Sequence, residues 1–353
     1  MIENINAESV FRWIFRNKDD LSSVVFFFIS KRNATNARFH SLFEQTQNIR
    51  IVYFSGTIFG KLDRISIFLF SKILLVLRGK IAKYDQIHLF NTDLNVKIKT
   101  QVLHIDDPAY TDLELIKIKS WERTLTRNNL KAYLVCTNNY SYNWYKTHLV
   151  YTNVVIIEQG FHEMFLPITR GDFSLVYSSP YIHYGRDKHS QHTTWGASLL
   201  IDEIIPEIVL ADPTIKIKLI GELGINAKQA LSKFENVLFY ERVSFKENMK
   251  ILSTCSVGLY PRRHDHKRSI LKIYSYIGAG LPVVTFDLID TEVIKLNSLG
   301  YSVNSVSQFV QKIIDLKRDK ALLSVFQKNI EKFRTPYSWK NLANKMESIF
   351  QEK

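Results

Sequence analysis

The chain has 353 residues, of which 46% are hydrophobic and 23% charged, and these ordinary globular values exclude a largely disordered or fibrous protein. The length predicts two domains, each large enough to bury its own core. The net charge of +13 calls for an anionic partner, but the basic residues divide almost evenly along the chain and form no basic tail, which argues against nucleic acid.

Apolar strand patterns alternate with helical patterns along the first half of the chain. Strands are expected at residues 24–29, 49–54, 86–90, 101–105, 132–137 and 153–158, and helices at 37–47, 112–127 and 140–148. Strands separated by helices of this length predict a parallel, doubly wound sheet.

The longest apolar run covers residues 65–77 and contains Lys72. It is too short to span a bilayer. It is expected either as a buried helix or as a helix docked on an anionic membrane surface. The cations that flank it and favour the second alternative are Arg64, Arg78, Lys80 and Lys83.

The alternation breaks at residues 163–171, which is the expected domain boundary. Beyond it, strands are expected at 173–178, 215–220, 237–240, 257–260 and 281–285, and helices at 194–210, 226–234, 246–255, 269–278 and through most of 307–352. The second strand closes on Gly221, and Pro336 breaks the last helical region. The sequence therefore predicts Rossmann-like domains over residues 1–165 and 170–335.

Residues 269–285 read as an amphipathic helix, a break at Gly280 and an apolar strand. A basic run precedes the helix: Arg262, Arg263, His264, His266, Lys267 and Arg268. A helix N-terminus presents unpaired N–H groups and a positive dipole end, so the added cations predict a site for a phosphate-bearing ligand. The alternative is a solvated basic loop before an ordinary core helix.

Residues 272–284, KIYSYIGAGLPVV, resemble the signature of GT-B glycosyltransferases, K-hydrophobic-x-E-Y-hydrophobic-A-x-G-x-P-V-V. Lys272, Gly280 and Pro282 match the family's lysine, glycine and proline. Ser275 stands where the family usually has a glutamate, and Lys267 stands where the other acid of the paired-glutamate motif is expected.

The strand–loop–helix segment 236–247 and the strand 256–261 are also similar to the family, with Glu241 in place of a glycine. The resemblance implies two Rossmann-like domains that face a cleft, and a helix over residues 336–353 that packs back on the N-terminal domain.

The resemblance further implies that the C-terminal half binds a nucleotide-diphosphate sugar, of UDP type, without a metal or another cofactor. The expected donor contacts are Arg186, Lys188, Gly221, Glu222, Val243, Arg263, Lys267, Arg268, Lys272, Tyr274 and Ser275. For Arg186 and Lys188, which resemble the family's diphosphate-binding pair, the alternative is an ordinary surface loop. The C-terminal half contains no Asp-x-Asp after an apolar strand, which disfavours a metal-dependent donor site.

In the N-terminal half, ligands are expected at the carboxyl ends of the strands. This rule selects Gly56, Thr57, Asn138 and His162 as acceptor contacts, and Asp106, Asp107 and Glu158 as candidates for the general base. The base must accept the proton of the acceptor hydroxyl. Asp106 and Asp107 favour an inverting mechanism, and the alternative is that one of them caps the following helix.

The expected function is transfer of a sugar from a nucleotide-diphosphate donor to a hydroxyl acceptor. The resemblance implies a glycan or lipid-linked glycan acceptor in bacterial polysaccharide biosynthesis. A sugar-nucleotide epimerase has the same architecture but should show a tight set of His, Glu and Asp in the C-terminal half. A non-enzymatic RNA- or membrane-binding module would need interleaved aromatic and basic residues or a one-sided patch.

The two cysteines, Cys136 and Cys255, lack metal-type spacing and are expected to be reduced core thiols. Residues 1–20 carry acidic and polar side chains where a signal peptide has an apolar core. The expected location is therefore the cytoplasm, with possible peripheral attachment to the inner face of the plasma membrane.

Overall fold

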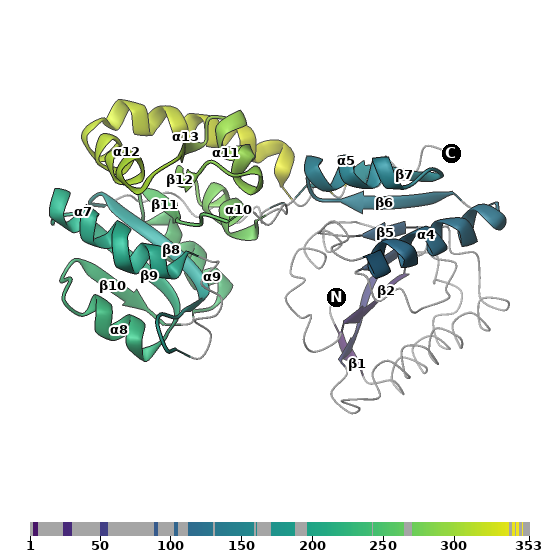
Figure 1. Cartoon of the computed structure of the whole chain (residues 1–353), viewed down its shortest axis with the longest axis horizontal. Helices are drawn as coiled ribbons and strands as arrows, with labels where there is room; N and C mark the ends of the chain where they lie inside the picture. The colour runs from purple at the N-terminus through teal and green to yellow at the C-terminus, as the bar shows by residue number, and fades with distance from the viewer. Residues whose placement is uncertain are drawn as a thin grey trace. The chain divides into compact units, whose positions relative to one another are not determined.

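The structure is a computed structural model that describes residues 3–5, 24–29, 50–55, 88–90, 102–104, 112–129, 131–158, 160, 171–187, 196–241, 243–264, 270–338, 341, 342, 344, 345 and 348. The chain forms two compact units (Figure 1). One consists of Met1–Gly160 together with Trp339–Lys353, and the other of Phe161–Ser338. The apolar run at residues 65–77 lies outside the described residues.

The first unit contains two parallel sheets among its described residues. The three-stranded sheet has the order β1 (Glu3–Ile5), β3 (Arg50–Ser55), β2 (Val24–Ile29). The four-stranded sheet has the order β4 (His88–Phe90), β5 (Val102–His104), β6 (Ala132–Cys136), β7 (Thr152–Ile156). Helices α4 (Asp112–Arg127) and α5 (Asn139–His148) flank β6 in sequence, and they share with it a core that includes Leu125, Leu134 and Tyr145.

The second unit is built on a six-stranded parallel sheet with the order β10-β9-β8-β11-β12-β13. Its strands are β8 (Ser174–Ile182), β9 (Lys216–Leu223), β10 (Val237–Tyr240), β11 (Val257–Tyr260), β12 (Val283–Phe286) and β13 (Gly300–Val303). Because both faces of this sheet are covered, its strands are continuous apolar runs, and every residue of β11 and of β12 is buried.

Helices cover both faces of the six-stranded sheet. The helices and short turns are α6 (Ala197–Leu199), η5 (Leu200–Ile204), α7 (Ile205–Ala211), α8 (Ile225–Leu231), α9 (Phe245–Ser253), α10 (Leu271–Gly278), η6 (Ile289–Thr291), α11 (Glu292–Leu296), α12 (Val306–Arg318), α13 (Lys320–Arg334) and η7 (Thr335–Tyr337). One apolar core contains side chains of α7, α8 and α12 with Leu175 and Leu259 of the sheet. The other contains side chains of α9, α10 and α13 with Val176 and Tyr260. The neighbouring residues Leu175 and Val176 thus enter different cores, as the two-residue period of a strand requires.

The prediction of an α/β fold with doubly wound parallel sheets is confirmed. The predicted ends of the first two strands of the second unit are wrong. β8 continues past Ser178 to Ile182 and β9 continues through Gly221 to Leu223, because the two strands resume pairing after an irregularity between Ser178 and Tyr181. The short strand β13 and helix α11 were not predicted, since four or five residues give too little periodicity.

The remaining expectations that concern the described residues have clear outcomes. Gly280 ends α10 in the left-handed region, with φ +75°, as its C-terminal position predicts. Pro336 lies in the short turn η7 after α13, where the helix break was predicted. Cys136 and Cys255 are both buried thiols that form no disulfide among the described residues, as expected. No helix in the described part of the chain is long and apolar enough to cross a membrane.

Gly221 gives a test of the extended β8–β9 pairing. Its φ is +143°, and a Cβ placed on it would overlap the carbonyl oxygen of Ser179. We expect Gly221→Ala to lower the free energy of unfolding by about 1–3 kcal/mol, because backbone strain and the close contact both oppose a side chain there. Gly171→Ala is the control, since a Cβ there meets no atom within 4 Å. Equal urea midpoints for the two variants would contradict the described pairing.

Candidate functional site

The central strands β8 and β11 lie side by side, and the chain winds away from them in opposite directions. From β8 it proceeds outward to β9 and β10, and from β11 outward to β12 and β13. Such a reversal opens a crevice at the carboxyl ends of the two central strands, where doubly wound sheets bind ligands. Among the described residues, β8 pairs with β11 only at Leu175–Val257 and Val176–Gly258, so the two strands can separate beyond these positions.

Arg262 lies two residues beyond the end of β11 and is 5% exposed. Its Nη1 donates a hydrogen bond of 3.1 Å to the Tyr260 hydroxyl. Its Nε and Nη2 are buried and have no hydrogen-bond partner in the described part of the chain. An arginine stays charged at physiological pH, and a buried charge with unused donors is costly. The guanidinium therefore suits a ligand with paired anionic oxygens, such as a phosphate.

Lys272 lies beside Arg262, in the first turn of α10. Its Nζ is 4.1 Å from the centre of the Tyr177 ring and 5.7 Å from that of Tyr260. Burial, and then the charge of Arg262, lower the pKa of Lys272 to about 7. Among the described residues no carboxylate contributes to this pKa. The half-buried ammonium thus has aromatic faces for neighbours and a second cation nearby, and an anion between the two would stabilise both.

The beginning of α10 adds to the positive character of this place. Ile270, at the N-cap position, provides no side-chain hydrogen bond to the first turn. The N–H of Ile273 donates to the carbonyl oxygen of Ile270 at 3.0 Å, and the first turn of α10 carries the positive end of the helix dipole. Two side-chain cations and a helix N-terminus therefore lie beside Tyr177 of β8 and the carboxyl end of β11.

An imidazole and two carboxylates lie near the carboxyl ends of β8 and β9. His183 is 7% exposed, and its Nε2 is 3.8 Å from Oε1 of Glu222. Asp187 accepts hydrogen bonds from the backbone N–H groups of Tyr184, Asn226 and Ala227. Burial alone would raise the pKa of Asp187, but these bonds and the nearby His183 lower it below the ordinary value. Asp187 thereby fixes the turn after β8 against the start of α8.

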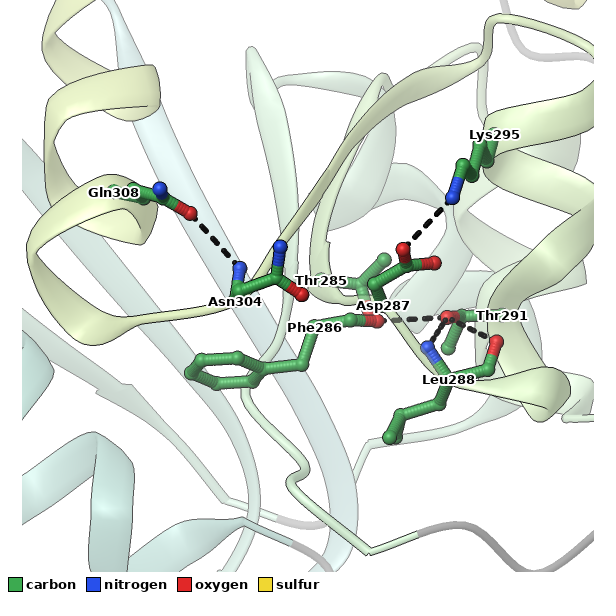
Figure 2. Close-up of polar contacts among 8 residues, drawn as sticks. All are labelled: Thr285, Phe286, Asp287, Leu288, Thr291, Lys295, Asn304 and Gln308. Atoms are coloured by element: carbon green, nitrogen blue, oxygen red, sulfur yellow. Dashed lines mark hydrogen bonds and ion pairs between the residues drawn. The ribbon is translucent and has the colours of Figure 1, made fainter.

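The ends of β12 and β13 are held by local polar contacts (Figure 2). The Thr291 hydroxyl donates to the carbonyl oxygen of Phe286 at 2.8 Å. Asp287 forms an ion pair of 2.8 Å with Lys295, and the backbone N–H of Asn304 donates to the side chain of Gln308. These contacts satisfy polar groups just beyond the ends of both strands.

The predicted donor residues have different surroundings in the structure. Lys272 lies at the site with Arg262. Gly221 and Glu222 lie inside β9, so their predicted loop position is wrong, and Gly221 packs against Ser179. Tyr274 is buried in the core that contains α10, and half-buried Val243 packs against that core.

Three further predicted donor residues lie in the described part of the chain. Arg186 is exposed in the turn after β8. Arg263 is exposed too; its guanidinium lies 5.5 Å from the centre of the Phe286 ring, and its Nη2 is 3.4 Å from Glu203. Ser275 is half-buried in α10. Lys188, Lys267 and Arg268 lie outside the described residues.

The predicted residues of the first unit are less completely described. The Glu158 carboxylate forms an ion pair of 2.9 Å with Lys345, which belongs to the same unit. The Asn138 side chain accepts a hydrogen bond from the N–H of Ser141 and caps α5. Gly56, Thr57, Asp106, Asp107 and His162 lie outside the described residues.

Sequence reasoning did not single out Arg262, although it noted the basic run that begins there. The rule that ligands bind beyond the carboxyl ends of strands also selects this arginine, because β11 ends at Tyr260. Tyr177 and Tyr260, the aromatic neighbours of Lys272, were likewise missed as parts of the site. In the described part of the chain, no group of three His, Cys, Asp or Glu side chains is arranged to hold a metal ion.

The candidate site lies in a segment of the chain that matches a known protein family. Residues 182–319, which include Arg262 and Lys272, match the family described as glycosyl transferases group 1. No curated protein matches the chain by sequence.

Solved structures share the fold. A mutant of TarM from S. aureus, in complex with fondaparinux, alpha-GlcNAc-glycerol and UDP, aligns with a TM-score of 0.56 and 16% identity. The match covers 79% of this chain and 58% of the TarM chain, so this chain spans little more than half of that protein. WaaG, a glycosyltransferase involved in lipopolysaccharide biosynthesis, aligns with a TM-score of 0.58 and 13% identity over 94% of this chain and 100% of its own.

A putative UDP-N-acetylglucosamine 2-epimerase from Listeria monocytogenes has the same architecture. It aligns with a TM-score of 0.53 and 10% identity over 94% of this chain and 97% of its own. The family match and the shared fold confirm the resemblance that the signature segment carries. Residues 182–319 of the second unit thus resemble the glycosyl transferases group 1 family, and the chain has the fold of the GT-B glycosyltransferases.

Proposed function

We propose that this protein transfers a sugar from a nucleotide-diphosphate donor to a hydroxyl group of an acceptor. The proposal rests on the buried guanidinium of Arg262, which has two unused donor groups and lies beside Lys272 just beyond the end of β11. A diphosphate supplies the negative charge and the acceptor oxygens that this pair lacks. Both residues lie in the segment that matches the glycosyltransferase family.

The donor is proposed to be of UDP type and to bind without a metal ion. Arg262 and Lys272 carry the charge that a divalent cation would otherwise supply to the diphosphate, and they also stabilise the leaving group as its charge develops. Arg186, Lys188, Lys267 and Arg268 remain proposed contacts to the same diphosphate. The proposal of a UDP-type donor is supported by the GT-B fold, which this chain shares with a TarM structure that contains UDP.

The general base is proposed to be Asp106, and failing that Asp107. A carboxylate at the carboxyl end of a strand can accept the proton of the incoming hydroxyl in a single, inverting displacement. Glu158 is the weaker candidate, because its carboxylate is engaged with Lys345. Gly56, Thr57, Asn138 and His162 are the proposed acceptor contacts.

The acceptor is proposed to be a lipid-linked glycan of bacterial surface polysaccharide synthesis, reached from the cytoplasmic face of the membrane. The net charge of +13 favours attraction to anionic lipid. The basic residues around the apolar run 65–77 would add to this attraction. The shared fold with WaaG, a protein of lipopolysaccharide biosynthesis, supports the same acceptor class.

A second candidate function is epimerisation of a nucleotide sugar. His183 and Glu222, with Asp187 near the same imidazole, form the kind of His, Glu and Asp set that such an enzyme would need in this half. The fold is also shared with a putative epimerase. Arg262 and Lys272 could bind the diphosphate of the nucleotide sugar in either reaction. The two candidate functions therefore differ in whether the reaction requires an acceptor.

A direct test incubates the protein with a panel of nucleotide sugars, with and without bacterial lipid extract. We expect release of the nucleoside diphosphate only when the extract is present, because the sugar needs an acceptor hydroxyl. Conversion of the donor without acceptor would favour the epimerase.

The variant Asp106→Asn should bind donor normally and lose about 10²–10⁴-fold in turnover, the usual contribution of a positioned base. Full activity of this variant would exclude Asp106.

The basic pair is tested by calorimetry with UDP. We expect Arg262→Gln and Lys272→Gln each to weaken binding by about ten- to a hundredfold, because a charge-assisted hydrogen bond contributes about 1.5–3 kcal/mol. Lys216→Gln is the matched control, since this exposed lysine at the start of β9 pairs with Asp172. Wild-type affinity in both site variants would show that the pair binds no diphosphate.

The pH dependence of UDP binding follows from the low pKa of Lys272, about 7. Above this pH the lysine is mostly neutral in the free protein, whereas bound diphosphate favours its charged form. UDP binding should therefore take up close to one proton at about pH 8.5, and its affinity should fall as the pH rises from 7. Calorimetry in buffers of different ionisation enthalpy measures this uptake. Lys272→Met should abolish it, and an uptake unchanged in that variant would contradict the assignment.

A further inference from the structure

Tyr276 of α10 lies where β8 and β11 stop pairing with each other. Its side chain is fully buried. Its hydroxyl accepts a hydrogen bond of 2.9 Å from the N–H of Ser178 in β8, and it donates one of 3.3 Å to the carbonyl oxygen of Leu259 in β11. Both partners lie beyond the last residues at which the strands pair, Val176 and Gly258. One side-chain hydroxyl thus satisfies a donor of one strand and an acceptor of the other.

This contact replaces backbone pairing. Buried N–H and C=O groups need partners, and neighbouring strands usually provide them to each other. Because the Tyr276 hydroxyl lies between Ser178 and Leu259, these backbone groups are satisfied while the strands stand apart. Burial raises the pKa of Tyr276 well above its ordinary value, so the hydroxyl keeps the proton that it donates to Leu259.

Gly258 makes room for the Tyr276 ring. A Cβ on Gly258 would lie 2.6 Å from Cγ and Cδ2 of the ring, closer than real Cβ contacts come. The ring can therefore rest directly on the backbone of β11, which brings its hydroxyl to the gap between the strands.

The partners of Tyr276 adjoin the residues of the candidate site. Lys272 precedes Tyr276 by four residues in α10, so both lie on the same side of the helix. Ser178 directly follows Tyr177, whose ring lies under Lys272. Arg262 follows Leu259 by three residues, just beyond the end of the same strand. Any change in the gap between the strands would move Arg262 relative to Lys272.

We infer that Tyr276 is a positioning residue, whose hydroxyl holds β8 at Ser178 and β11 at Leu259 at the separation at which Arg262 and Lys272 bind one diphosphate. The inference rests on the proposed function, because it concerns the same anion site. Tyr276 does not touch the ligand; it acts through the two strands and through α10.

The test compares Tyr276→Phe with Ser256→Ala. The first variant keeps the ring and removes the hydroxyl. The second removes the buried hydroxyl that accepts from the N–H of Ser174 at 3.3 Å, which joins the same two strands at their amino ends. UDP affinity is measured by calorimetry well below both unfolding temperatures. We expect about a tenfold weaker affinity for Tyr276→Phe, from displaced charge-assisted bonds, and wild-type affinity for Ser256→Ala.

The proton uptake at about pH 8.5 provides a readout that a loss of stability alone would not change. It should fall in Tyr276→Phe, because Lys272 moves away from its place beside Arg262 and regains a more ordinary lysine pKa. Wild-type affinity and proton uptake in Tyr276→Phe would overturn the inference and leave the donor site intact. Absence of UDP binding by the wild-type protein would overturn the donor site and, with it, the inference.

Hydrogen exchange of the wild-type protein tests the same idea if Tyr276→Phe does not fold. The N–H of Ser178 donates to the Tyr276 hydroxyl. UDP should slow its hydrogen exchange more than that of the Ser174 N–H at the amino end of β8. Equal changes at the two amides, under conditions in which UDP is bound, would show that the gap between the strands is independent of the ligand.

Discussion

Two cations lie close together at the end of β11, and one of them is almost fully buried. Arg262 has two buried donor groups without partners in the described part of the chain, and its charge contributes to the lowered pKa of Lys272. A protein interior does not favour such a pair unless something anionic completes it. Binding of an anion offsets the free-energy cost of burying Arg262 close to a second cation. The proposed donor site depends on this constraint.

The surrounding backbone is shaped to keep the pair in place. Gly196 has a φ of +85°, and a Cβ on it would overlap the carbonyl oxygen of Pro261, so the start of α6 lies directly against the residue before Arg262. On the other side, Gly258 admits the ring of Tyr276 and so anchors α10, which carries Lys272. Two glycines thus bring two helices to the end of one strand, where side chains with a Cβ would hold them away.

The sequence predicts much of this arrangement but not its decisive detail. Alternating apolar patterns predict the parallel sheets, and the signature segment predicts both Lys272 and the break at Gly280. The unused donors of Arg262 become visible only when its neighbours are placed, since nothing in a basic run tells which member is buried. The position of Glu222 inside β9 depends on pairing with β8 after an irregularity, which no local pattern encodes.

A crystal structure with bound UDP tests the central claim most directly. The account predicts that the diphosphate lies between the carboxyl ends of β8 and β11, with its oxygens within hydrogen-bond distance of Nε and Nη2 of Arg262 and of Nζ of Lys272. The separation of Ser178 and Leu259 across the Tyr276 hydroxyl should be preserved. A diphosphate bound elsewhere, with the Arg262 donors still unused, would contradict the account.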